Sequence, residues 1–161
     1  MVQLIRTDSQ NRDFRHLVHY LDRELAERDG DDHAFYHQFN KIDKIKHVVV
    51  AYLDHTPAGC GAIKEYESGV AEVKRMFVLA NQRRMRIASQ LLKELEQWAA
   101  ELNYHTLILE TGQAQPEAIA LYRKSGYQQI PNYGQYAGVE NSVCMKKTLW
   151  QEQQPEPESV L

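Results

Sequence analysis

The sequence predicts a single α/β (α+β) domain with a mixed, mostly antiparallel central sheet that is flanked by helices. Residues 46–53, 58–66 and 70–78 are rich in β-formers and are separated by turn residues, a pattern typical of an antiparallel meander. The run at 70–78 precedes a helical pattern and then the strand-like run 106–111, which together predict a βαβ unit with two parallel strands. The sheet is therefore mixed, and 161 residues suffice for one domain with its own core.

The N-terminal part is predicted to contain one strand and one amphipathic helix. Residues 2–5 are strand-like, and Asp8-Ser9 is a typical helix start. Apolar side chains then recur at helical spacing from Phe14 to Leu25. A short helical piece at residues 35–39 leads into the meander.

The C-terminal part is predicted to contain two helices and a final pair of strands. The polar connection Leu79–Arg84 precedes the longest helical pattern, which runs from Ile87 to Asn103. A second helix begins at Pro116, which suits a first helical position, and ends at about Lys124, where Gly126 is placed to terminate it. The last strand pair, around a loop rich in Gly and Tyr, is predicted at residues 127–130 and 142–149.

Charge and composition restrict the function classes. Nineteen Lys and Arg against 22 Asp and Glu give a formal charge of −3, but residues 150–161 hold three Glu and no basic residue, so 19 acidic residues remain against 19 basic ones. A balanced body has no global attraction for nucleic acid or for an anionic membrane. We expect one domain at residues 1–149 and a flexible acidic tail at residues 150–161.

The N-terminus and the cysteines indicate the compartment. The chain reaches the charged Arg6 after five residues, which argues against a secretory signal or a membrane span there. Two cysteines do not make a disulfide scaffold, and Cys60 and Cys144 each lie in an apolar run, where buried thiols are more common than nucleophiles. We therefore expect a protein of the reducing cytoplasm.

The polar turn before the longest helix is a candidate anion site. The first-turn amides of a helix lack partners and carry the positive end of the helix dipole, and this turn adds Arg83, Arg84 and Arg86. A phosphate group would fit such a turn. Charge alone also agrees with a solvated surface run.

Two motifs resemble those of the GNAT superfamily of acetyl-CoA-dependent N-acetyltransferases. Residues 83–88 read Arg-Arg-Met-Arg-Ile-Ala, against the family pattern Gln/Arg-x-x-Gly-x-Gly/Ala, so Arg86 stands at the inner glycine. Residues 115–127 read Gln-Pro-Glu-Ala-Ile-Ala-Leu-Tyr-Arg-Lys-Ser-Gly-Tyr and match Asn-x-x-Ala-x-x-Leu-Tyr-x-x-x-Gly-Phe/Tyr except at Gln115. The resemblance covers residues 2–149 in element order and is sharpest over 70–127.

The resemblance implies the acyl-CoA N-acyltransferase (GNAT) fold and acetyl-CoA as co-substrate. In the family, a bulge splays the motif-bearing strand from its parallel neighbour and frees backbone groups for the pantetheine arm. An arginine at the glycine position costs little at negative φ and about 1 kcal/mol or more at positive φ. The implied coenzyme-binding residues are Met76, Phe77, Val78, Arg83, Arg84, Met85, Arg86, Ile87, Ala88, Ser89 and Gln115.

A general base is needed because an amine with a pKa near 10.4 is neutral in only about one molecule in a thousand at pH 7. The resemblance implies that Glu72, eleven residues before Arg83, takes this role. Glu72 is alternatively an ion-paired strand residue, for instance with Lys74, and Glu110 on the parallel strand is the competing base.

The departing thiolate benefits from a proton donor, and the resemblance assigns this role to Tyr122. Tyr122 shares a predicted helix face with Ala118 and Ile119. Outside this motif, a tyrosine on a helix is more often a core residue.

The acceptor pocket is implied at the loop between the last two strands, where Tyr133 and Tyr136 lie, with Glu110 nearby. A self-packed loop is the alternative. His33 and His37 share a predicted helix face, but two ligands do not complete a metal site, so we expect no metal.

The expected reaction is direct transfer of acetyl from acetyl-CoA to a primary amine of a small molecule or a peptide. We expect no nucleic-acid or membrane partner, and a homodimer stays an open alternative. Arg86 and Gln115 leave a second reading, a catalytically degenerate CoA-binding sensor. A third reading is a nucleic-acid module with a basic patch, built from Lys74, Arg75, Arg83, Arg84 and Arg86.

Overall fold

The structure is a computed structural model that describes residues 1–30 and 44–150. In these ranges the chain forms one seven-stranded sheet with the order β1-β2-β3-β4-β5-β7-β6. The predicted helical piece at 35–39, His33, His37 and the tail from 151 onward lie outside the described residues. The elements are β1 Val2–Thr7, α1 Arg12–Asp29, β2 His47–Leu53, β3 Thr56–Glu67, β4 Val70–Val78, the 3₁₀ helix η2 Ala80–Met85, α3 Ile87–Glu101, β5 Thr106–Gly112, α4 Pro116–Lys124, β6 Gln128–Ile130, the 3₁₀ helix η3 Gly134–Tyr136 and β7 Ser142–Thr148.

The predicted meander is confirmed as β2, β3 and β4. Asp54 and His55, both with positive φ, form the two-residue turn between β2 and β3. Gly69, with φ +80°, closes the turn between β3 and β4. The mixed character of the sheet is also confirmed, because β4 and β5 are parallel whereas every other neighbouring pair is antiparallel.

Helix α1 starts later than the sequence predicts. Asn11 is its N-cap and accepts the Phe14 amide at 2.9 Å. The side chain of Asp8 instead accepts the Gln10 amide, and Ser9 Oγ accepts the Ile45 amide at 3.1 Å. Both expected caps therefore hold the turn before the helix rather than the helix itself.

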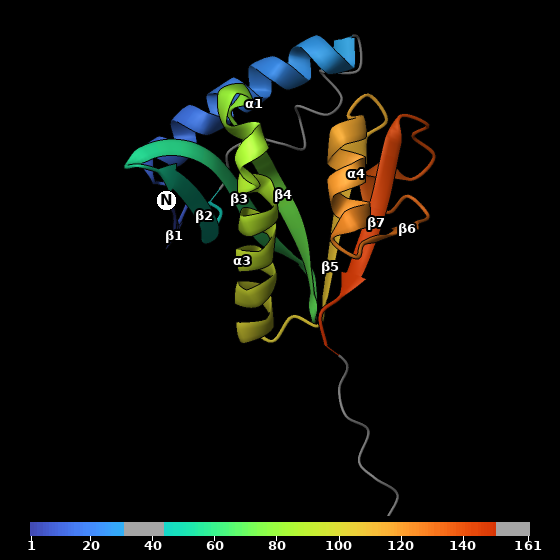
Figure 1. Ribbon diagram of the computed structural model, residues 1–161. Helices are drawn as coiled ribbons and strands as arrows, with labels where there is room; N and C mark the ends of the chain where they lie inside the picture. Colours follow the sequence, from blue (N-terminus) through green and yellow to red (C-terminus); the bar gives the residue numbers. More distant parts are fainter. Residues whose placement is uncertain (31–43, 151–161) are drawn as a thin grey trace, which may run out of the picture.

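The two faces of the sheet carry different helices (Figure 1). The alternation along β2 places Val48 and Val50 in the cluster that packs on α1, and Val49 and Ala51 in the cluster that packs on α3. The α3-side cluster also takes in residues of α4. Cys60 and Cys144 are buried, unpaired thiols, as expected. None of the helices in the described ranges is long and apolar enough to cross a membrane.

The central strands β4 and β5 part after three residue pairs. Val70, Ala71 and Glu72 pair with Thr106–Ile108, and the register ends there. On its other side, β5 pairs with β7 along its whole length. Figure 1 shows β4 and β5 meeting at one end and diverging toward the start of α3. The expected splay is therefore present.

A bulge bends β4 at the same place. Cys60 pairs with Phe77 and Ala62 with Lys74, so β4 holds one more residue than β3 between these pairs. Arg75 lies in the bulge with φ +58°, a left-handed conformation that few residues other than glycine adopt. The bulge directs the second half of β4 away from β5.

The polar connection after β4 is helical rather than irregular. Residues Ala80–Met85 form η2, and Arg86 then joins η2 to α3 in the left-handed conformation, with φ 56° and ψ 24°. Helix α3 ends at Glu101, two residues before the predicted Asn103, which has φ +69°. The predicted bounds of β4 and α4 are confirmed to the residue.

Candidate active site

Two cavities meet at the place where β4 and β5 part. The large cavity has a volume of about 360 Å³ and lies between β4, the start of α3, α1 and α4. The small cavity has a volume of about 100 Å³ and lies between the middle of β4 and the end of β5. The residues that line both are Leu21, Leu25, Met76, Gln115, Ala118 and Tyr122.

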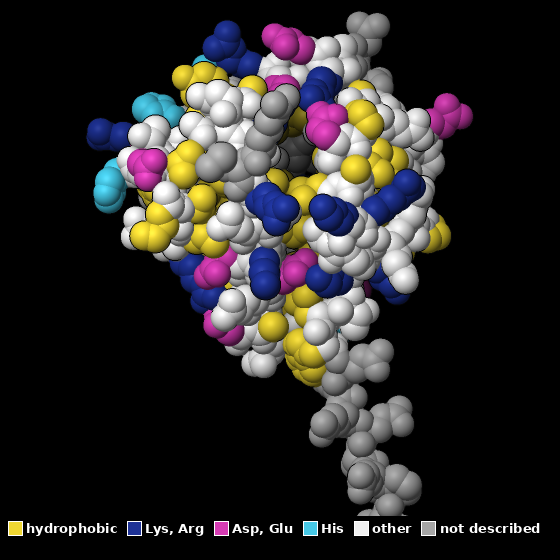
Figure 2. Space-filling view, in the orientation of Figure 1, with side chains coloured by type: hydrophobic (Ala, Val, Ile, Leu, Met, Phe, Trp, Pro, Cys, Tyr) yellow, Lys and Arg dark blue, Asp and Glu magenta, His cyan; other side chains and the backbone are white. Residues whose placement is uncertain are grey.

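The large cavity gathers most of the residues that the sequence assigns to the coenzyme. Figure 2 shows its mouth as a hollow between α3 and α4, with charged side chains around the rim. On the α1 and α4 sides the walls include Leu25 and Leu121. The predicted coenzyme residues that line it are Met76, Phe77, Val78, Arg83, Arg86, Ala88, Ser89 and Gln115.

Three other predicted coenzyme residues are not among the described side chains that line the large cavity. Ile87 is fully buried in the core beneath α3, so its side chain faces away from the cavity wall and its backbone amide alone can meet a ligand. Arg84 and Met85 contribute backbone to η2, and their side chains lie outside the described part of the structure. Ile87 therefore stays a predicted coenzyme residue through its backbone amide only.

Arg86 has a positive φ, and it occupies the position where the family motif has glycine. The left-handed conformation costs a residue with a Cβ about 1 kcal/mol or more. Arg86 makes no side-chain capping hydrogen bond to α3. The first-turn amides of α3 therefore stay available to a ligand in the large cavity.

Ion pairs hold the rim of the large cavity. Arg83 donates to the Val78 carbonyl at 2.9 Å and to Glu24 at 2.6 Å, so its guanidinium is tied to β4 and α1. Arg28 of α1 pairs with Glu117 of α4 and, at 3.1 Å, with Glu24. Hydrogen bonding by its own backbone amide, and then by Arg28, lowers the pKa of Glu117. Both acidic residues of this rim compete with a bound anion for the arginines.

Glu72 stands in the wall of the small cavity, at the last pair before the strands part. It is 8 % exposed, its Oε2 accepts the Tyr133 hydroxyl at 2.6 Å, and its Oε1 lies 3.3 Å from Lys74 Nζ. The ion pair with Lys74 that the sequence left open is therefore present.

Tyr133 contacts Glu72 rather than lining either cavity. Its ring packs edge-on against Tyr66, with centroids 5.2 Å apart, and against Tyr136 at 5.8 Å. Burial, and then the charge of Glu72, raise the pKa of Tyr133, so its hydroxyl remains a donor. A contact between Tyr133 and an acceptor stays a prediction; the structure places its hydroxyl on Glu72, which lines the small cavity.

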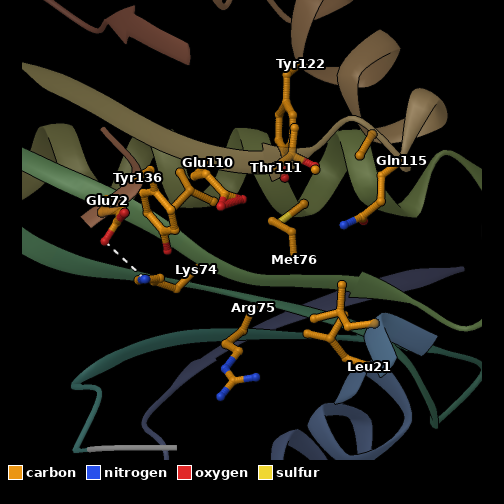
Figure 3. Close-up of a pocket in the computed structure, with 14 residues that line it drawn as sticks. Leu21, Glu72, Lys74, Arg75, Met76, Glu110, Thr111, Gln115, Tyr122 and Tyr136 are labelled. Atoms are coloured by element: carbon orange, nitrogen blue, oxygen red, sulfur yellow. Dashed lines mark ion pairs between the residues drawn. The ribbon is translucent and has the colours of Figure 1, made fainter. Parts of the chain in front are cut away.

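Glu110 and Tyr136 line the small cavity, as the sequence predicts. Glu110 accepts the Ser142 hydroxyl at 3.2 Å. In Figure 3, Glu110 lies between Glu72 and Tyr122. Burial, and then the charge of Glu110, raise the pKa of Tyr136 to a value well above the usual one for tyrosine. The loop before β7 therefore closes one side of the cavity.

Tyr122 lies at the junction of the two cavities. It is 6 % exposed, and its ring packs on Tyr127 with centroids 5.7 Å apart. Burial, and then the charge of Glu110, raise the pKa of Tyr122. Its hydroxyl makes no hydrogen bond to any residue of the described chain, which leaves the proton free to be donated to a ligand.

Sequence reasoning missed the placement of Lys74 and Arg75 in the site: it considered Lys74 as an ion-pair partner of Glu72 and both residues as part of a basic patch. Both line the small cavity. Two consecutive cations in a mostly apolar strand were the available signal. Among the described residues no group of three or more His, Cys, Asp or Glu could hold a metal ion.

Comparisons with known proteins agree with this geometry. The model of the acetyltransferase (GNAT) family matches residues 10–127. The chain is 41 % identical over 102 residues to an IAA acetyltransferase of Azospirillum brasilense, a match that covers 63 % of this chain and 67 % of that relative.

Solved structures share the fold. A candidate acyl-CoA N-acyltransferase from Klebsiella pneumoniae has a TM-score of 0.78 and 28 % identity, over 93 % of this chain and 99 % of that one. A GNAT family acetyltransferase from Elizabethkingia anophelis with acetyl-CoA bound has a TM-score of 0.55 and 18 % identity, over 63 % of this chain and 75 % of that one.

Proposed function

The chain belongs to the acetyltransferase (GNAT) family and is an acetyl-CoA-dependent N-acetyltransferase, and from that premise we propose that it transfers acetyl directly to the primary amine of a small molecule or peptide. The observation that carries the proposal is the position of Tyr122. Tyr122 is the shared lining residue with an acidic hydroxyl, in contact with both the large cavity, where the predicted coenzyme residues gather, and the small cavity with its two carboxylates. Donor and acceptor can therefore meet beside a single proton donor.

The large cavity fits the coenzyme. Beyond Glu72, β4 has no strand partner on its β5 side in the described chain, so the backbone of Met76, Phe77 and Val78 can pair with an extended arm that carries amides. The first-turn amides of α3 suit a diphosphate. When bound, acetyl-CoA supplies the thioester that serves as acyl donor. We propose Arg86, Ala88, Ser89 and Gln115 as further contacts, with Arg83 once it leaves Glu24.

Glu110 fits the role of base better than Glu72. Its charge acts on Tyr122, so the two side chains are close enough for one to take a proton from the amine while the other gives a proton to the thiolate. Tyr133 and Lys74 hold the two carboxylate oxygens of Glu72 in place. We therefore assign proton removal to Glu110, which the sequence names as the competing base, and the positioning of Lys74 and Tyr133 to Glu72.

Tyr122 supplies the second proton. The amine nitrogen bonds to the acetyl carbonyl carbon and its proton passes to Glu110, while the carbon–sulfur bond breaks and the thiolate sulfur takes the Tyr122 proton. Strand amides of β4 polarise the carbonyl. Transfer of one proton from Glu110 to Tyr122 through solvent restores both groups, and no covalent acyl-enzyme is required.

A coupled measurement tests this proposal. Acetyl-CoA consumption is followed with a panel of amines, and CoA binding is measured by calorimetry on the same protein. We expect CoA to bind and at least one amine class to be acetylated. CoA binding without turnover of any amine would instead support the degenerate sensor.

We also propose a cytoplasmic location. Cys60 and Cys144 are buried and unpaired, and burial raises their pKa values to about 12 and about 11. Inert free thiols of this kind fit a reducing compartment. Localisation of a tagged chain in its host tests this, and recovery outside the cytoplasm would contradict it.

A further inference from the structure

Arg75 has a buried donor that the fold does not use. Its side chain is 3 % exposed, and Nη1 donates to Asp22 of α1 at 2.9 Å. Nη2 is buried and has no hydrogen-bond partner in the described chain. Leaving such a group unpaired is costly, and more so for a charged group. A buried guanidinium with an unused donor therefore indicates a partner that binds from outside.

The position of Arg75 suggests what that partner is part of. The bulge of β4 holds Arg75 in the small cavity wall, next to Lys74. Figure 3 shows the Arg75 side chain extending toward α1, away from Glu110 and Tyr122. The cavity therefore has carboxylates at one end of its lining and an arginine at the other. Such a charge distribution matches a ligand with an ammonium and an anion.

We propose that Arg75 binds a carboxylate of the acceptor, so that the acceptor is an amino acid or another small amine that carries a carboxylate. The inference rests on the proposed acetyl transfer, and it names the acceptor class. The guanidinium fork matches a carboxylate in shape as well as charge, because its N–H donors can meet both oxygens. The reactive nitrogen then lies toward Glu110 and Tyr122, where proton transfer takes place.

The volume of the small cavity agrees with this class. A closed cavity of about 150 Å³ holds benzene, which has six heavy atoms, so about 100 Å³ holds roughly four, and the adjoining large cavity gives an acceptor further room. The nitrogen, Cα and carboxylate of an amino acid are five heavy atoms. An acceptor with a second ammonium in place of the carboxylate would instead meet Lys74 and Arg75, a repulsion between like charges.

Substrate trios test the inference without altering the protein. Each trio comprises an amino acid, its amide and the decarboxylated amine, with rates compared at equal concentrations of the neutral amine. We expect kcat/KM for the amino acid to exceed both others by about 10-fold or more. Equal or faster acetylation of the amide or the decarboxylated amine would overturn the carboxylate inference and leave the acetyltransferase reaction intact.

Variants separate anion binding from a purely structural ion pair. Arg75→Gln should reduce the preference for the amino acid over its amide by about 10-fold, mainly through KM, while CoA affinity is retained. Asp22→Asn breaks the same ion pair but keeps the guanidinium, so the preference should persist. A preference that survives Arg75→Gln, or that is lost equally in Asp22→Asn, would count against the proposal. If Arg75→Gln does not fold, the substrate trios decide alone.

Discussion

The two cavities recognise their ligands in different ways. The large cavity offers main-chain groups of β4 and the first-turn amides of α3, whereas the small cavity offers the charged side chains of Glu72, Lys74, Arg75 and Glu110. Recognition by backbone depends on the path of the chain, and Arg86 keeps the left-handed conformation that the motif requires without a glycine. Recognition by side chains depends on their identity. Coenzyme binding should therefore survive substitutions that abolish or redirect the use of the acceptor.

The largest expected effect on turnover comes from a substitution of Tyr122, at the junction of the two cavities. Tyr122→Phe should lower kcat by about 10²-fold or more, the usual contribution of a general acid, with CoA affinity unchanged within about 2-fold. Because burial raises the pKa of Tyr122, the wild-type hydroxyl stays protonated at alkaline pH, and the alkaline loss of kcat should fall above pH 10.

Tyr127→Phe is the matched control for this prediction. It also removes a hydroxyl from a buried ring, but Tyr127 lines neither cavity and its hydroxyl donates to Glu96 at 2.8 Å. We expect some loss of stability and little change in kcat. Turnover by Tyr122→Phe at the rate of Tyr127→Phe would remove Tyr122 from the mechanism.

The next largest effect distinguishes the two carboxylates of the small cavity. Glu110→Gln should reduce kcat/KM by about 10²-fold, because the proposed base beside Tyr122 is lost. Glu72→Gln should cost about 10-fold, since Tyr133 and Lys74 lose their anchor. Steady-state kinetics over pH measure both. A larger loss in Glu72→Gln would return the role of base to Glu72.

The sequence alone predicts much of the fold that produces this contrast. The bounds of β4 and α4 are correct to the residue because Gly69, Pro116 and Gly126 mark turns and helix ends by local chemistry. The start of α1 is wrong by three residues because Asn11, Asp8 and Ser9 are all competent caps. Their choice depends on Ile45, which is distant in the sequence.

The candidate site also has one part that the sequence predicts and one part that it does not. The α3 and α4 sides of the large cavity follow from two local motifs, since each motif lies on one turn or one helix, whereas the α1 side belongs to no motif. The hydrogen bond between Tyr133 and Glu72 joins residues 61 positions apart, and it depends on the order of the strands rather than on any local pattern. The left-handed Arg75 and its contact with Asp22 likewise require the register between β3 and β4.

A smaller expected effect tests whether CoA binding in the large cavity depends on main-chain groups rather than on the Arg86 side chain. Arg86→Gly should raise the free energy of unfolding by about 0.5–1 kcal/mol, because glycine relieves the left-handed strain. Urea denaturation measures this. CoA affinity should change by less than about 3-fold.

Asn103→Gly is the control, because Asn103 has φ +69° and lines neither cavity. Its gain in stability should be smaller, since asparagine tolerates this conformation. A large loss of CoA affinity in Arg86→Gly would show that the large cavity also binds its ligand through a side chain, as we propose for the small cavity.

The smallest effect concerns the rim. Glu24→Gln should tighten CoA binding by about 2- to 5-fold, because Arg83 loses the partner that competes with a phosphate. Titration calorimetry at low salt measures the change. Glu27→Gln, on an exposed position of the same helix, should leave the affinity unaltered. Weaker binding in Glu24→Gln would mean that Arg83 holds α1 in place and does not bind the phosphates of CoA.

The short contact between β4 and β5 has a consequence for the lifetime of the protein. Only three residue pairs join the strands β1–β4 to β5, β7 and β6, so the sheet has a natural hinge at one end. A coenzyme arm lying in the gap would supply the missing pairing and stabilise the folded state in proportion to its occupancy. We therefore expect proteases to attack mainly the empty molecules, which links the survival of each copy to the supply of acetyl-CoA.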